Sequence, residues 1–340
     1  MSGISVIIPC YNCADEIEQT VESVLANTLS PHEIVAVDDC STDRTREVLR
    51  DLERRYPGIV RVVTCDANMG PGRARNAGVR AAVGEYLFFV DSDLRLNADA
   101  LQRFARRIDE CDAVVGIYAE DPVDSGLAGQ YKSRLYYYLL GRVGVQPYDQ
   151  FSASCAGIRA RVYADLGGYD EWFEPGVDLE NEEFGHRIAA QYRMLLDPSI
   201  QGQHRFPSLG KMTRTFFFRT ALWVEMLLVR RRFSTMAGTP SMGLSSVALL
   251  AAVLLLPLGL LTSAAFVAAA GAYLVYLYGF AGFFAYLFRT RPRFLPAAFV
   301  LSHWFTLVIA SGAVLGVAKV VFGSSAIAKR FGRSTAAAYE

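Results

Sequence analysis

The sequence predicts an α/β fold in which helices flank both faces of a mostly parallel sheet, followed by interfacial helices and a C-terminal transmembrane helical region. Two observations support this prediction. Short apolar runs alternate with amphipathic stretches in the first part of the chain, whereas residues 244–322 are almost entirely apolar. Strands that alternate with helices favour a parallel sheet, and a membrane helix needs about 20 apolar residues in a row.

The predicted strands are short runs rich in β-branched or aromatic residues. They occupy residues 5–9, 33–37, 60–64, 85–90 and 113–118. Amphipathic periodicity predicts helices at residues 15–26, 41–56, 72–83 and 179–191. From residue 109 to residue 197 the pattern is looser, and residues 113–118 and 179–191 are the only regular elements predicted there. Ligands bind beyond the carboxyl ends of the strands in such sheets, so the functional residues should lie there.

The charge balance gives no sign of a nucleic-acid-binding protein. The 34 basic and 34 acidic residues cancel, so no nucleic-acid partner is expected. Residues 1–9 lack the basic stretch, apolar core and cleavage site of a secretory signal. We therefore expect a cytosolic N-terminal domain, at the plasma or inner membrane if the protein is bacterial.

An amphipathic segment, residues 207–240, follows the predicted sheet domain at residues 1–206. Its central part, residues 211–233, combines aromatic and aliphatic side chains with lysine and arginine, which is typical of a helix in the membrane interface. The alternative is an ordinary amphipathic helix packed on the domain. A transmembrane region at 241–323 and a basic tail at 324–340 complete the predicted organisation.

Three stretches are long and apolar enough to cross a bilayer: residues 243–261, 263–288 and 294–322. Positive charge before the first stretch and at 289–293 predicts that both of these ends are cytoplasmic, with the turn near Thr262 outside. A third crossing would carry Lys329 and Arg330 outward, against the positive-inside tendency. The third stretch is therefore spanning, re-entrant, interfacial or folded back.

Two carboxylates end the predicted strand at residues 85–90. Asp91 and Asp93 are separated by one residue, which aims both side chains the same way. Carboxylate oxygens, together with phosphate oxygens and water, are the ligands that Mg²⁺ prefers. Such a pair alone is more often a solvated strand end. Polar residues after two further strands, residues 9–12 and 38–43, favour the metal site.

The loop at residues 68–78 is punctuated by glycines and opens a predicted helix. Arg73 and Arg75 in this loop suit phosphate binding. The alternative is that the glycines only make turns and that both arginines are solvated. That alternative explains this loop alone, but not the polar residues at three strand ends.

Together these segments resemble the ordered motifs of family 2 glycosyltransferases, which have the GT-A fold. The motifs are SVIIPCYN at 5–12, VDDCSTD at 37–43, NMGPGRARNAG at 68–78 and DSD at 91–93. The resemblance covers residues 1–206. It implies a nucleotide-sugar site formed by Pro9, Tyr11, Asn12, Asp38, Asp39, Asn68, Gly70, Arg75, Asn76, Asp91 and Ser92. It also implies that Asp93, helped by Asp91, binds Mg²⁺ or Mn²⁺.

A later family motif resembles residues 180–187, Glu-Asn-Glu-Glu-Phe-Gly-His-Arg. The position that usually holds the catalytic aspartate is Asn181 here, and a neutral amide cannot accept a proton. Glu180 and Glu182 flank it, and Asp178 is another substitute. We favour Glu180 as the base, whereas Glu183 lies one turn before Arg187 and suits a structural ion pair.

Three later residues are further site candidates. His204 resembles the late histidine that some family members bring to the metal or diphosphate, although a lone histidine is as often structural. Arg214 and Arg219 are candidates to contact the donor's diphosphate or the phosphate of a lipid headgroup.

The implied function is inverting, metal-dependent transfer of a sugar from a nucleotide-sugar, UDP being the commonest carrier in the family, to a membrane-associated acceptor. A phosphate acceptor such as polyprenyl phosphate is already ionised and tolerates Asn181. The alternatives are transfer to a lipid-linked sugar or glycan, and an inactive nucleotide-sugar-binding membrane scaffold. A processive synthase is disfavoured because the sequence has no Gln-x-x-Arg-Trp motif.

Overall fold

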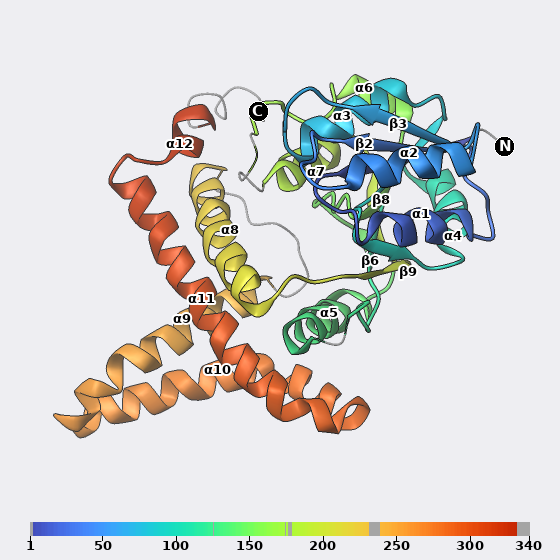
Figure 1. Ribbon diagram of the computed structural model, residues 1–340. Coiled ribbons are helices and arrows are strands. Elements are labelled where there is room, and N and C mark those ends of the chain that lie inside the picture. Colours follow the sequence, from blue (N-terminus) through green and yellow to red (C-terminus); the bar gives the residue numbers. More distant parts are fainter. Residues whose placement is uncertain (1–2, 125, 174, 176–178, 231–238, 332–340) are drawn as a thin grey trace. The chain divides into compact units, whose positions relative to one another are not determined.

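The computed structural model describes residues 3–124, 126–173, 175, 179–230 and 239–331 (Figure 1). The chain forms two compact units. The first, here called the sheet unit, comprises Met1–Ser125 and Leu139–Phe206. The second, the helical unit, comprises Gly126–Tyr138 and Pro207–Glu340. The short segment that interrupts the sheet unit thus belongs to the helical unit, although the sequence suggested one continuous domain over residues 1–206.

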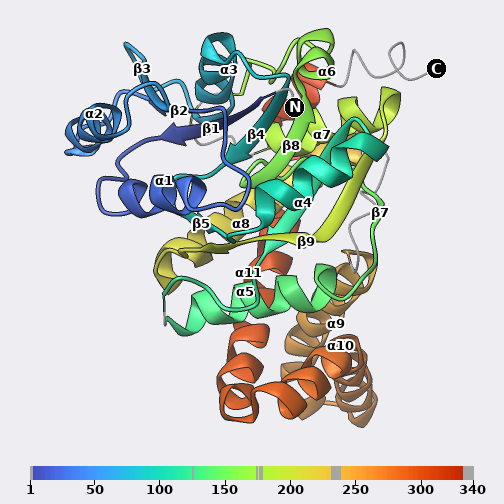
Figure 2. The ribbon, with the colours of Figure 1, turned by 90° about the vertical axis from the view of Figure 1, so that its right-hand side faces the viewer.

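The sheet unit contains one mixed nine-stranded sheet (Figures 1 and 2). Its strand order is β3-β2-β1-β4-β8-β6-β9-β5, and β7 also pairs with β9. Strands β5, β7 and β8 run against the other six, so the predicted mostly parallel sheet is confirmed. The strands are β1 Ile4–Cys10, β2 Glu33–Asp38, β3 Val60–Thr64, β4 Tyr86–Val90, β5 Leu94–Leu96, β6 Ala113–Tyr118, β7 Gln146–Pro147, β8 Cys155–Arg159 and β9 Met194–His204.

Alternating side chains of β1 pack on the two faces of this sheet. Val6 and Ile8 belong to a core cluster with Val21 of α1 and Leu52 of α2. On the other face Ile7 packs on α3, where a Cβ at Gly78 would clash with it. Successive strand residues point to opposite faces, so an all-apolar strand such as β1 can bury both.

The helices of the sheet unit largely follow the predicted ones. They are α1 Ile17–Leu25, α2 Thr45–Arg55, α3 Pro71–Ala81, α4 Ala100–Arg107, α6 Ala160–Asp165 and α7 Glu180–Gln191. The helix predicted at 41–56 begins later, at Thr45. Its expected first turn is a loop, because the backbone N–H groups of Thr42 and Asp43 donate to Oδ1 of Asn12, at 2.8 and 3.3 Å.

The helical unit contains the long apolar helices. Its members are α5 Leu127–Leu140, α8 Leu209–Arg230, α9 Thr239–Leu255, α10 Ser263–Thr290, α11 Leu295–Val321 and α12 Ala326–Phe331. Three segments have the length and composition to cross a membrane: Met242–Leu260, Ser263–Thr290 and Pro292–Val321. They match the three predicted stretches and indicate that the protein associates with a membrane.

Candidate active site

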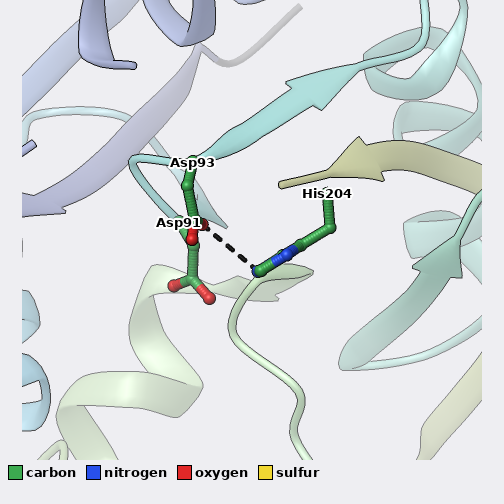
Figure 3. Close-up of side chains that lie close together, drawn as sticks. All are labelled: Asp91, Asp93 and His204. Carbon is green, nitrogen blue, oxygen red and sulfur yellow. Dashed lines mark ion pairs between the residues drawn. The ribbon is translucent and has the colours of Figure 1, made fainter. Parts of the chain in front are cut away.

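The carboxyl ends of β4 and β9 bring three potential metal ligands together (Figure 3). Asp91 and Asp93 follow β4, and His204 is the last residue of β9. One ligand atom of each lies within 4.8 Å of the others, and His204 Nε2 is 3.2 Å from Asp93 Oδ1. The pairing of Leu94 in β5 with His204 holds the two segments in this register. His204 lies more than a hundred positions after Asp91 and Asp93 in the sequence, and strand pairing in the sheet makes it their neighbour.

Aromatic rings fix the imidazole of His204. Its ring centre lies 4.7 Å from that of Tyr118 and 4.6 Å from that of Phe206. Two carboxylates and an imidazole suit Mn²⁺, and the carboxylates alone suit Mg²⁺. The carboxylate oxygens of Asp91 and Asp93 and the imidazole nitrogen of His204 are therefore chemically suitable ligands for the divalent ion that the sequence predicts.

Arg75 connects this cluster to the start of α7. Its guanidinium is buried, with Nη2 2.8 Å from Asp91 Oδ1 and Nη1 3.4 Å from Glu180 Oε1. Burial by itself would lower the pKa of Arg75, but Tyr169 and the two carboxylates outweigh it and raise that pKa. The positively charged guanidinium of Arg75 thus forms ion pairs within the protein that hold Asp91 and Glu180 in place.

The first residues of α7 face this arrangement in different ways. Glu180 is buried beside Gly72, where a Cβ would lie 3.2 Å from Glu180 Cγ. Asn181 accepts a hydrogen bond from the Tyr169 hydroxyl at 3.1 Å, and Glu182 is buried as well. Glu183 accepts from Arg187 Nε and Nη2 at 2.9 and 2.8 Å, the ion pair within one helix that the sequence predicts.

Asp39 closes the glycine-punctuated loop. Its carboxylate accepts the backbone N–H groups of Met69 and Gly70 at 2.9 and 2.8 Å. Asn68 Oδ1 accepts from Gly70 N at 3.2 Å. Gly70 has φ +87°, a left-handed conformation that favours glycine. Burial raises the pKa of Asp39, and the two N–H donors offset only part of that increase.

Asp38, the last residue of β2, is fully buried and has its own partners. It accepts from Ser41 N at 3.0 Å and from Arg46 Nε at 2.7 Å. Burial acts to raise the pKa of Asp38, but these hydrogen bonds outweigh it and lower the pKa. Asn12, with φ +49°, lies in the adjacent loop, next to the exposed Tyr11. Pro9 lies in β1, opposite Val37.

Other predicted site residues are engaged within the protein. Asn76 Nδ2 donates to the carbonyl of Tyr169 at 2.9 Å, and its Oδ1 accepts from the Tyr163 hydroxyl at 2.6 Å. Arg73 is partly buried and donates to the backbone carbonyl of Glu171. Ser92 lies between the two site aspartates, and its carbonyl accepts from the Thr20 hydroxyl at 2.8 Å.

The two arginines considered for phosphate contact lie on α8, in the helical unit. Arg214 is exposed, with its guanidinium 5.9 Å from the ring centre of Phe218. Arg219 is half-buried. Asp178, considered as a substitute base, lies outside the described residues.

Tyr169 is a site residue that sequence reasoning missed. It contacts three site side chains: its ring lies 5.6 Å from the Arg75 guanidinium, its hydroxyl donates to Asn181, and its backbone binds Asn76. The two preceding residues, Gly167 and Gly168, both have positive φ and make the turn that positions it. This Gly-Gly pair in the sequence was the signal that could have indicated a constrained loop.

Residues 5–167 match the family described as Glycosyl transferase family 2. Poly(ribitol-phosphate) beta-glucosyltransferase of Bacillus spizizenii is 37% identical over 103 residues, which cover 30% of this chain and 16% of that protein. The putative teichuronic acid biosynthesis glycosyltransferase TuaG of Bacillus subtilis is 42% identical over 100 residues, 29% of this chain and 39% of that protein. The match to these relatives thus spans well under half of their length.

TarS of Staphylococcus aureus, a poly(ribitol-phosphate) beta-N-acetylglucosaminyltransferase, is 35% identical over 113 residues, which cover 32% of this chain and 19% of that protein. The crystal structure of S. aureus TarS 1-349 in complex with UDP-GlcNAc aligns with 66% of this chain and 66% of that one. The sequence identity in this alignment is 22% and the TM-score is 0.49.

Proposed function

This chain carries a family 2 glycosyltransferase domain, and from this premise we propose that it transfers a sugar from a nucleotide-diphosphate donor to a membrane-associated acceptor, with inversion at the anomeric carbon. The observation that carries the proposal is the cluster of Asp91, Asp93 and His204 at the carboxyl edge of the sheet. Arg75 links this cluster to Glu180. Potential metal ligands and a candidate base thus occupy one connected site, as sugar transfer requires.

The donor in this proposal is a uridine diphosphate sugar carrying a hexosyl group. Relatives named as a glucosyltransferase and an N-acetylglucosaminyltransferase support the hexosyl group. Asn12, Asp38 and Asp39 surround the ends of β1 and β2 and would border the nucleotide. Asp39 is already bound to the loop at Gly70, so it would help to shape the pocket for the base.

Asp91, Asp93 and His204 are the residues that would hold Mg²⁺ or Mn²⁺. When bound, such an ion supplies positive charge that stabilises the departing diphosphate. Arg75 keeps the Asp91 side chain oriented through its 2.8 Å ion pair. The ring contacts of Tyr118 and Phe206 do the same for His204.

In the proposed reaction an acceptor oxygen attacks the anomeric carbon as the bond from that carbon to the diphosphate oxygen breaks. The nucleoside diphosphate leaves with the bonding electrons, and the configuration inverts. With a hydroxyl acceptor, its proton passes to a carboxylate, for which Glu180 is our choice. Asn181 cannot serve, and it is held by Tyr169.

Polyprenyl phosphate is the acceptor we propose first. It is a lipid, which suits the three long apolar helices, and its phosphate needs no base, which suits Asn181. The names of the relatives favour the second candidate, a hydroxyl of a lipid-linked glycan, because they act on poly(ribitol-phosphate) or in teichuronic acid synthesis. In both cases the sheet unit would lie in the cytosol, where nucleotide-sugars are made.

A transfer assay on membranes containing the protein tests this proposal. Nucleotide-sugars are supplied with Mg²⁺ or Mn²⁺ and either polyprenyl phosphate or lipid-linked glycan. We expect sugar transfer to lipid that falls on the order of 100-fold in Asp93→Ala, since a metal contributes several kcal/mol. Asp99→Ala, an exposed acid outside the site, is the control. Donor binding without transfer or hydrolysis would instead indicate the inactive scaffold.

Glu180→Gln separates the two acceptors. If a hydroxyl is the acceptor, loss of the base should lower kcat by about 100-fold or more. If a phosphate is the acceptor, kcat should change by less than about tenfold, because the nucleophile is already ionised. Glu182→Gln, one residue past Asn181, is the matched control for the choice of Glu180.

A further inference from the structure

Helix α11 has two different faces along its whole length. One stripe is buried and includes Ala298, Phe305, Gly312 and Gly316. The opposite stripe exposes large apolar side chains: Val300, Val314, Val317 and Val321. A helix surrounded by lipid on all sides needs no such division, whereas a helix lying between protein and lipid does.

The C-terminal half of α11 packs in parallel against α8. Gly312 and Gly316 are spaced as in a GxxxG motif, and a Cβ at either would clash with an α8 backbone carbonyl, that of Phe217 or Ala221. The contacts follow the same order along both helices: Thr213 with Trp304, Phe217 with Gly312, Ala221 with Gly316 and Glu225 with Lys319. The two helices therefore run side by side in one direction.

A buried ion pair joins α8 and α11 near their C-terminal ends. Glu225 is 1% exposed, and its Oε1 lies 3.1 Å from Lys319 Nζ. Glu225 is thus tied to α11 rather than to solvent. The exposed Val317, two residues before Lys319, lies on a different face of α11, and the buried partner Glu225 places the charged pair on the protein side of the helix.

The N-terminal half of α11 packs against α5. The ring of Phe305 stacks on Tyr131 at 5.6 Å, and the Arg134 guanidinium lies 4.4 Å from the ring centre of Phe294, just before α11. Tyr138 of α5 reaches the end of α10, with its ring 5.5 Å from that of Phe283. Both halves of α11 are thus covered by helices from earlier in the chain.

Chain continuity places α5 and the N-terminal end of α8 on the same side of the membrane as the sheet unit. Residues Gly126–Tyr138, which form most of α5, are preceded by Ser125 and followed by Leu139, both in the sheet unit. The 14 residues of α5 span about 21 Å, less than a bilayer core of about 30 Å, so α5 cannot cross. Helix α8 begins at Leu209, directly after the sheet unit ends at Phe206.

The basic residues at the two ends of α11 agree with this placement. Arg289, Arg291 and Arg293 precede the helix, and Lys319, Lys329 and Arg330 lie at or beyond its end. If α11 crossed the bilayer, one of these groups would lie on the outer side. Lysine and arginine favour the cytoplasmic side, so the distribution disfavours a crossing.

We propose that α11 does not cross the membrane but lies along the lipid surface, with both ends on the side of the sheet unit. Its exposed apolar stripe meets the lipid, and α5 and α8 cover its other face. Only α9 and α10 then cross, as a hairpin whose turn at Thr262 is on the opposite side. This inference concerns membrane topology and is independent of the reaction proposed above.

Cysteine labelling of the full chain tests this arrangement. Three exposed positions receive a cysteine in separate variants: Thr262→Cys, Arg293→Cys and Ser324→Cys. Cys40, the least buried native cysteine, reports the side of the sheet unit. Cells are treated with a membrane-impermeant maleimide before or after permeabilisation, and labelled peptides are quantified by mass spectrometry. An unchanged thermal unfolding temperature in detergent shows that each variant is folded.

We expect only Thr262→Cys to be labelled in intact cells. Labelling at Arg293→Cys, Ser324→Cys and Cys40 should appear only after permeabilisation. Labelling of Ser324→Cys in intact cells, with Arg293→Cys and Cys40 protected, would show that α11 crosses and would overturn the proposal. Protection of Thr262→Cys would also overturn it, because the α9–α10 hairpin would then not cross.

Discussion

Arg75 is buried, and its guanidinium bridges two acids of the site. Nη2 is 2.8 Å from Asp91 and Nη1 is 3.4 Å from Glu180, while Tyr169 covers its face. A planar group with several fixed donors can hold two carboxylates at once, which an ammonium group does less well. We therefore assign Arg75 a positioning role for the potential metal ligand and the candidate base.

Arg75→Lys should lower kcat by at least about tenfold while changing the donor KM less, because two carboxylates lose their orientation and not their charge partner. Thermal unfolding in detergent should show a loss of about 1–3 kcal/mol for the weakened buried hydrogen bonds. Arg73→Lys is the matched control, since Arg73 donates to a backbone carbonyl outside the cluster. Equal effects of both substitutions on kcat would argue against the positioning role.

At the scale of single elements, strand β9 brings most of the site's distant parts together. It pairs with β6, β5 and β7, and its last residue is His204. Asp197 lies where the pairing of β9 with β6 shifts register. Its Oδ1 accepts the Ser199 hydroxyl at 2.7 Å, and its Oδ2 lies 2.8 Å from Arg107 Nε of α4. Burial acts to raise the pKa of Asp197, but Ser199 and Arg107 outweigh it and lower the pKa.

Asp197→Asn should destabilise the protein by about 1–3 kcal/mol at neutral pH. Because the folded-state pKa of Asp197 is depressed, its contribution is present above its ordinary pKa of about 4 and is lost as pH falls through the lower folded value. As the pH falls from about 4 to the folded-state pKa of Asp197, the free energy of unfolding should therefore decrease less in the variant than in the wild type. Thermal unfolding at several pH values measures this difference. Asp99→Asn, which removes an exposed pair with Arg103, is the control.

The pairing of α8 with α11 makes a second prediction at the scale of elements. Gly316→Leu should force the helices apart, because even a Cβ there meets the Ala221 carbonyl. Overpacking of this kind costs typically about 1–3 kcal/mol, so the thermal unfolding temperature in detergent should fall by several degrees.

Gly271→Leu is the control for this prediction, since Gly271 lies in α10, where a Cβ would meet no neighbouring atom within 4 Å. It makes the same substitution in another long apolar helix. An unchanged unfolding temperature for Gly316→Leu would show that the close approach of α8 and α11 does not contribute to stability.

At the scale of the whole molecule, the chain combines a sheet unit with a helical unit rich in exposed apolar side chains. Segments such as Ser263–Thr290 have a mean hydropathy of 1.6 and little burial within the protein. Exposed apolar surface of this extent requires lipid or detergent. Helix α5 adds a further link, because it lies in the helical unit while both chain segments around it lie in the sheet unit.

The full chain should therefore remain in the membrane fraction after an alkaline carbonate wash and be released by a mild detergent. The physical reason is that extracting a crossing helix exposes tens of apolar side chains to water. Removing a protein that is bound only to the membrane surface breaks mainly ion pairs. Immunoblotting of pellet and supernatant measures the outcome. Release by carbonate would indicate that neither α9 nor α10 crosses the bilayer.

Features that depend on local patterns could be predicted from the order of the amino acids alone. The apolar run at residues 113–118 became a strand with the predicted limits, since a strand buried on both faces is apolar throughout. Residues 60–64 also became a strand with the predicted limits, but it is the half-exposed edge strand β3. The Asp91-Ser-Asp93 spacing, the glycine loop and the three long apolar stretches were also readable, because each is a short-range or compositional signal. Elements between residues 119 and 178 were not predicted, as their short and irregular runs match no period.

Which distant residues meet was set by the packing of the folded chain. The approach of His204 to Asp93 depends on the pairing of β5 with β9, and the bridge from Asp91 through Arg75 to Glu180 depends on how α3 and α7 pack. The motif resemblance implied that Arg75 shapes the nucleotide pocket, and in the structure its guanidinium contacts Asp91 and Glu180. Contacts of this kind are non-local, so no window of the sequence contains both partners.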